Sequence, residues 1–76
     1  MDIQTFVENF TYQFDETDAS AFKADTKFKD LDEWSSLLAL SIIAMVDEEY
    51  SVAIKGDDIR NAETIEDLFN TIKQKV

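Results

Sequence analysis

The chain contains no cysteine, no histidine and no proline, and its only glycine is Gly56. Without cysteine it forms no disulfide and offers no thiolate to a metal ion. Without histidine it lacks the commonest general base, so Ser/His/Asp, Cys/His and zinc-type sites are excluded. Carboxylate pairs remain, but a domain of 76 residues offers few ways to bury two together. We therefore expect neither a catalytic site nor a metal site.

Basic residues are also scarce. Seven Lys and Arg stand against 17 Asp and Glu, which gives a formal net charge of −10. Nucleic acids and anionic membrane surfaces bind basic proteins, so both are disfavoured as partners. Basic protein partners are favoured, because opposite charges steer association. Acidity that serves only to keep a small protein in solution is the alternative explanation.

Long apolar runs are absent. The longest, residues 37–46, is interrupted by Ser41 and is shorter than the roughly 20 residues that span a bilayer. The N-terminus lacks the basic and apolar regions of a signal peptide. We expect a single domain over residues 1–76, no membrane insertion, a cytoplasmic location and a monomer.

Helical periodicity is clear at three places. Residues 2–14 repeat apolar side chains at spacings of three and four, with Asp2 at the N-cap. Residues 36–50 contain no Gly or Pro, and Ser35 and Ser36 at their start both offer an N-cap. Residues 64–75 begin at Thr64, with Asp67 placed for a capping box.

The remaining segments read as connections. Residues 15–35 are rich in turn formers and predict a long ordered loop, with a short helical turn within it and four side chains packed on the core: Phe22, Phe28, Leu31 and Trp34. Val52 and Ile54 suit an extended link, Gly56 a turn, and Asp57 or Asp58 the cap of one short helix. The predicted class is all-α, a four-helix bundle of three main helices and one short helix with a long first loop.

The segment 36–50 is apolar on more sides than core packing requires. One stripe, suited to the core, comprises Ala39, Ile42, Ile43, Val46 and Tyr50. A second stripe, turned away by about 100° or more, comprises Leu37, Leu40, Ala44 and Glu48. Leu38 and Met45 lie on the remaining side. Such a helix is either central in its bundle or keeps an apolar face for a partner.

Acidic residues gather at the wrong end of this segment. Asp47, Glu48 and Glu49 fall in its last turn, where the helix dipole disfavours anions by roughly 0.3–1 kcal/mol each. The cluster is either kept for recognition or is an ordinary solvated surface.

An ordered series of motifs resembles the acyl carrier protein family over essentially the whole chain. Ser35-Ser36-Leu37, opening a helix that closes in Glu48-Glu49-Tyr50, is similar to the family's Asp-Ser-Leu signature and Glu-Glu-aromatic ending. Three flanking segments also match: Phe28-Lys29-Asp30-Leu31, Ile54 with Asp58-Ile59, and Thr64-Ile65-Glu66-Asp67-Leu68. The sequence departs from the family at three places, where Ser35 replaces Asp, Glu33 replaces Gly and Ser51 replaces Gly.

The resemblance implies a non-catalytic carrier of the acyl-carrier fold. It implies a phosphopantetheine arm, transferred from coenzyme A by a phosphopantetheinyl transferase, on Ser36, with Ser35 as the less favoured site. The arm would hold acyl groups as thioesters for fatty acid or polyketide-type synthesis. Leu37, Leu40, Ala44, Asp47 and Glu48 would dock onto basic patches of acyl-synthesis enzymes, and Ala39, Ile42 and Val46 would line a cleft for the acyl chain. An aminoacyl, peptidyl or D-alanyl carrier and an unmodified acidic interaction module remain alternatives.

Overall fold

The computed structural model describes residues 2–76, and all regular structure within this range is helical. Four α-helices occur in the order α1 (Ile3–Thr11), α2 (Ser36–Tyr50), α3 (Gly56–Asn61) and α4 (Ile65–Lys75). Two single 3₁₀ turns, Ala19–Ala21 and Phe28–Asp30, lie in the long segment between α1 and α2. The predicted all-α class, with three main helices, one short helix and a long first loop, is confirmed.

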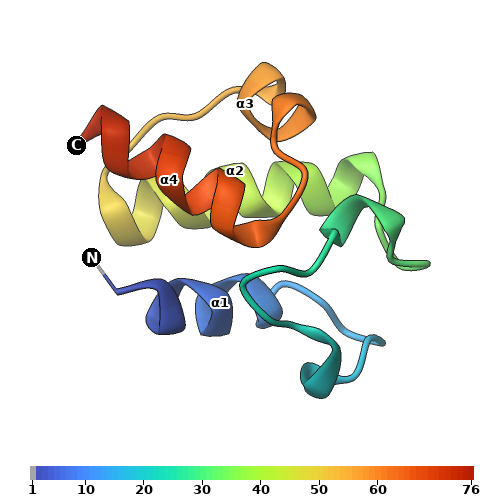
Figure 1. Ribbon diagram of the computed structural model, residues 1–76. Helices are drawn as coiled ribbons and strands as arrows, with labels where there is room; N and C mark the ends of the chain where they lie inside the picture. The colour runs from blue at the N-terminus through green and yellow to red at the C-terminus, as the bar shows by residue number, and fades with distance from the viewer. Residues whose placement is uncertain (1) are drawn as a thin grey trace.

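The helices enclose one core. The α1 helix contacts α2 and α4, and the short α3 helix also contacts both of them (Figure 1). Within residues 2–76 every buried side chain is apolar. Eight are buried almost completely: Phe6, Phe10, Phe28, Ile42, Ile65, Leu68, Ile72 and Val46. None of the helices described has the length and apolar character needed to cross a membrane.

Aromatic side chains attach the long loop to this core. The ring centroid of Phe10 lies 6.4 Å from that of Phe22 and 5.2 Å from that of Phe28. Trp34 in turn packs edge-on against Phe28, with 5.0 Å between centroids. Phe22 and Phe28 are buried, whereas Leu31 and Trp34 are half-buried against the core. The four side chains predicted to hold the loop therefore do so.

Polar contacts fix the same loop. The backbone N–H groups of Ile65 and Glu66, at the start of α4, donate to the carbonyl oxygens of Thr26 and Ala24 at 3.1 and 2.8 Å. These N–H groups have no partner inside their own helix. The two hydrogen bonds therefore satisfy backbone donors of α4 and backbone acceptors of the loop at the same time. The loop is thus ordered by burial and by hydrogen bonds.

Capping residues set the helix starts as predicted. Asp2 accepts a hydrogen bond from the Gln4 N–H at 3.2 Å. Thr64 and Asp67 form a reciprocal capping box, with both hydrogen bonds at 3.1 Å.

Two predicted helix ends are wrong. The first helix ends at Thr11 instead of residue 14, because the chain then turns and the Phe14 N–H donates to the Thr11 carbonyl. Phe14 is nevertheless buried. Gly56 opens α3 instead of marking a turn before it, and Lys55 is the N-cap residue.

The cap predicted at Asp57 or Asp58 is found at Asp58, but from inside the first turn of α3, where both aspartates lie, and not from the N-cap position. Asp58 still contributes from there, since its carboxylate accepts the Lys55 N–H at 2.9 Å.

Candidate functional site

The start of α2 is built around two serines with different roles. Ser35 is the N-cap residue in extended conformation, and its hydroxyl oxygen accepts the Leu38 N–H at 3.3 Å. Its carbonyl oxygen accepts the Ala39 N–H at 3.0 Å. Ser35 is therefore committed to starting the helix.

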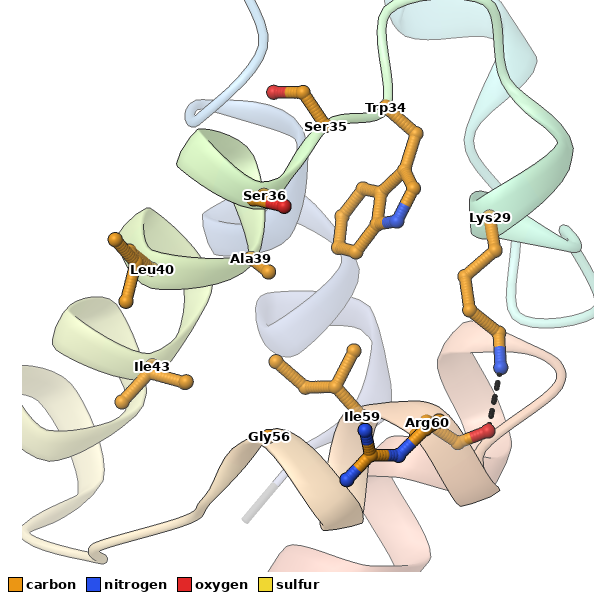
Figure 2. Close-up of a pocket in the computed structure, with 10 residues that line it drawn as sticks. All are labelled: Lys29, Trp34, Ser35, Ser36, Ala39, Leu40, Ile43, Gly56, Ile59 and Arg60. Carbon is orange, nitrogen blue, oxygen red and sulfur yellow. Dashed lines mark hydrogen bonds between the residues drawn. The ribbon is translucent and has the colours of Figure 1, made fainter.

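Ser36 is the first helical residue and is exposed. Among residues 2–76 no hydrogen-bond partner is found for its hydroxyl, and none for the N–H groups of Ser36 and Leu37. In Figure 2 the Ser35 hydroxyl points away from the pocket beside it, and the two hydroxyls point in different directions. Of the two serines, Ser36 has the free and accessible hydroxyl.

An open pocket of about 700 Å³ lies beside Ser36, between the start of α2, the long loop and α3. Its α2 wall comprises Ser36, Ala39, Leu40 and Ile43, and Ile59 of α3 and Trp34 of the loop complete the apolar lining (Figure 2). Trp34 is held by stacking on Phe14 and by its edge-on contact with Phe28. The apolar lining is thus supported by the core behind it.

Two cations lie on the side of this pocket away from α2 (Figure 2). The Lys29 ammonium donates to the Arg60 carbonyl oxygen at 2.7 Å and ties the long loop to α3. The Arg60 guanidinium forms an ion pair with Asp57, one turn earlier in α3. Lys29 and Arg60 were not predicted as site residues, because no local pattern connects positions that are 31 residues apart.

The predicted docking face on α2 is exposed. Leu37 and Leu40 have 73% and 63% of their surface accessible, and Ala44, Asp47 and Glu48 are exposed on the same helix. A fully buried central helix is therefore wrong. Within residues 2–76, no salt bridge is formed by Asp47, Glu48 or Glu49.

The core-facing side of α2 differs from the predicted stripe. Leu38, Ile42, Met45 and Val46 are buried, whereas Ala39, Ile43 and Tyr50 are half-buried. The buried face is thus rotated toward Leu38 and Met45. Of the three residues predicted to line a cleft, Ala39 borders the pocket, whereas Ile42 and Val46 lie in the closed core.

The perturbed carboxylates lie outside the pocket and serve the fold. The Thr17 hydroxyl lowers the pKa of Glu33, and backbone N–H groups of residues 15–17 act in the same direction. The Ser20 N–H lowers the pKa of Asp18, and the Thr64 N–H lowers that of Asp67. Within residues 2–76, no three carboxylates are placed together to hold a metal ion.

The site therefore consists of a free serine hydroxyl at a helix N-terminus, an apolar pocket with cations on its far side, and an exposed apolar and acidic face. Comparison with known proteins gives no relative to set beside it, since no family model, no curated protein and no solved structure matches the chain.

Proposed function

We propose that this chain is an acyl carrier protein whose Ser36 takes a phosphopantetheine arm. The observation that carries the proposal is the exposed, unbonded hydroxyl of Ser36 at the first position of α2, beside an apolar pocket. The ordered motifs over the whole chain support the same function. The proposed setting is fatty acid or polyketide-type synthesis in the cytoplasm.

The surroundings of Ser36 fit a phosphodiester. The N-terminus of a helix carries partial positive charge, and its first N–H groups lack partners inside the helix. Here the unpartnered N–H groups of Ser36 and Leu37 are available to an anion, while Ser35 already satisfies Leu38. Neutral Ser35 also adds no negative charge next to the phosphodiester.

The attachment chemistry requires only the serine oxygen from this chain. In the active site of a transferase, the Ser36 hydroxyl oxygen forms a bond to the pantetheine-linked phosphorus of coenzyme A. The pyrophosphate P–O bond breaks, adenosine 3′,5′-bisphosphate leaves, and the serine proton passes to a base of the transferase. When bound, the arm supplies the thiol that the amino-acid sequence lacks.

Ser36 lies next to a surface suited to basic enzymes. Leu37, Leu40 and Ala44 would supply apolar contact area, and Asp47 and Glu48 at the far end of α2 would meet Lys and Arg of the partner. Such charges chiefly raise the association rate and fix the orientation of the partner. This role accounts for carboxylates at a helix end where the dipole disfavours them.

The pocket would shelter the carried acyl group. Ala39, Ile43, Ile59 and Trp34 provide apolar contacts, and each methylene removed from water contributes at most about 0.8 kcal/mol. The melting temperature of the loaded protein should therefore rise with acyl length. An apolar pocket of this kind favours acyl groups over aminoacyl groups.

Intact mass measurement tests the proposal. The chain is incubated with coenzyme A, magnesium and a broad-specificity phosphopantetheinyl transferase, and a gain of one phosphopantetheinyl group is expected. Ser36→Ala should abolish the gain. Ser35→Asp is the matched control, because it keeps an N-cap side chain and should still be labelled.

Two results would contradict parts of this proposal. No mass gain with several transferases would contradict the carrier function and favour an unmodified interaction module. Labelling that survives Ser36→Ala but is lost in Ser35→Ala would move the attachment site to Ser35.

A further inference from the structure

The charged residues that line the pocket are positive, whereas the chain as a whole is strongly negative. Asp and Glu outnumber Lys and Arg by 17 to seven over the sequence. Among the residues that line the pocket, by contrast, Lys29 and Arg60 are the only charged ones. Asp57, the ion-pair partner of Arg60, is not part of the lining.

Both cations keep donors for a ligand. The Lys29 ammonium has three N–H groups, of which one donates to the Arg60 carbonyl oxygen. The Arg60 guanidinium has five, and its contact with Asp57 is made through one terminal nitrogen. Neither cation is therefore saturated by its present partner.

The order of chemistry across the pocket is also defined. Ser36 and the apolar side chains Ala39 and Ile43 form the α2 wall. Ile59 and Trp34 lie between that wall and the Lys29 ammonium, and the Arg60 guanidinium lies beside Ile59 on α3 (Figure 2). A group that enters from α2 meets apolar surface first and positive charge afterwards. A plain alkyl chain would use only the first part of this arrangement.

We propose that the pocket accepts an acyl group that ends in a carboxylate, held by Lys29 and Arg60 after an apolar segment of several methylenes. This inference rests on the proposed function, since it assumes that the acyl group is carried on Ser36. It assigns a substrate class, the ω-carboxyacyl groups, and two residues that select it.

The proposed contact and general charge repulsion predict opposite effects of an acyl carboxylate on the stability of the fold. A carboxylate added to a protein of net charge −10 would ordinarily destabilise the fold through repulsion between like charges. Only a local positive site reverses that sign. Stabilisation by an acyl carboxylate therefore indicates contact with a local positive site.

The test compares two acyl groups of six carbons, hexanoyl and adipoyl, loaded from their coenzyme A derivatives by the transferase. Adipoyl should give the higher melting temperature, by about 2–5 °C for one solvent-accessible ion pair in a domain of this size. The difference should shrink in about 1 M NaCl, because salt screens the pair. Fluorescence of Trp34, the only tryptophan, should differ between the two forms.

Variants assign the effect to the two cations. Lys29→Gln and Arg60→Gln should each reduce or abolish the adipoyl-minus-hexanoyl difference. Because this difference is taken within each variant, changes in the stability of the variant itself cancel. Lys27→Gln is the matched control. Lys27 is exposed, its Nζ lies 4.0 Å from Oε1 of Glu63, and it does not line the pocket. The adipoyl-minus-hexanoyl difference in melting temperature should therefore persist in this variant.

The inference would be overturned if, in the protein without substitutions, the melting temperature of the adipoyl form were equal to or lower than that of the hexanoyl form. It would also be overturned by a difference that survives in both Lys29→Gln and Arg60→Gln. Failure of every acyl group to load would instead contradict the proposed function itself, and this inference with it.

Discussion

The carboxylate of Glu33 accepts two hydrogen bonds from Thr17, one from its backbone N–H at 2.8 Å and one from its hydroxyl at 2.7 Å. The same carboxylate also accepts the N–H groups of Asp15 and Glu16, at 2.8 and 3.0 Å. One side chain just before α2 thus fixes three consecutive residues just after α1. This contact closes the long loop on itself and positions Trp34 and Ser35, which follow Glu33 directly.

Replacing Glu33 should loosen the loop. Glu33→Gln offers one carbonyl oxygen in place of two and brings an amide NH₂ group toward backbone donors, so we expect a lower melting temperature. Thr17→Val is the partner substitution, because it removes the hydroxyl and keeps the shape. In a double-mutant cycle the two effects should be less than additive, and full additivity would contradict a direct interaction.

The same contact predicts a pH dependence. The Thr17 hydroxyl and the N–H groups hold the pKa of Glu33 below its usual value of 4.5. The stabilisation is complete above that value, and it is lost as pH falls through the lower pKa of the folded state. The stability difference between the wild-type sequence and Glu33→Gln should therefore narrow as pH falls below about 5. Urea unfolding at each pH measures it, and a constant difference would contradict the prediction.

Local signals predicted the helices where a cap and a periodic face coincide. Thr64 with Asp67 and Ser35 with Leu38 each join residues within one turn, so the sequence alone defines those helix starts. The end of α1 was missed because Phe14 continues the apolar period although the backbone turns after Thr11. Burial of a side chain does not require that its backbone be helical.

For the candidate site, too, the sequence predicted what lies within one helix and missed what tertiary packing brings together. Ser36 and the exposed Leu37 and Leu40 were found from the sequence, because they belong to one helix and one motif. The far side of the pocket was not found, since Lys29 and Arg60 meet only when the long loop packs against α3. The rotation of the buried face toward Leu38 and Met45 depends likewise on where α1 and α3 contact α2.

Ser51 offers a stabilising substitution. This residue ends α2 in the left-handed region, at φ 56° and ψ 37°, where a side chain is unfavourable and glycine is not. Ser51→Gly should raise the free energy of unfolding by about 0.5–1 kcal/mol, after allowance for the greater freedom of glycine in the unfolded chain. Ser51→Ala is the control and should give no gain. Equal effects of Gly and Ala in chemical denaturation would contradict the backbone explanation.

Phe10 should be the costliest aromatic residue to truncate. It is fully buried and contacts Phe6, Phe14, Phe22 and Phe28, so Phe10→Ala should lower the free energy of unfolding by about 3–5 kcal/mol. That loss is a large part of the total of about 4–11 kcal/mol expected for a domain of this length. Tyr12→Ala is the contrast, because Tyr12 is 78% exposed and its loss should change stability by less than about 0.5 kcal/mol. Thermal unfolding by circular dichroism measures both.

The exposed face of α2 should separate stability from partner binding. Leu40→Ala removes a side chain that is 63% exposed, so we expect less than about 0.5 kcal/mol of change in stability. Glu48→Gln should even stabilise the fold, by about 0.3–1 kcal/mol, because it removes an anion from the negative end of the helix dipole.

If this face docks onto basic enzymes, both variants should nevertheless be labelled more slowly by the transferase, and the Glu48→Gln defect should diminish at high salt. Lys73→Gln, on the exposed side of α4, is the control and should be labelled at the normal rate. Normal labelling of both α2 variants would exclude this face from the transferase interface. If Glu48→Gln is more stable but is labelled more slowly, the Glu48 carboxylate serves recognition although it destabilises the fold.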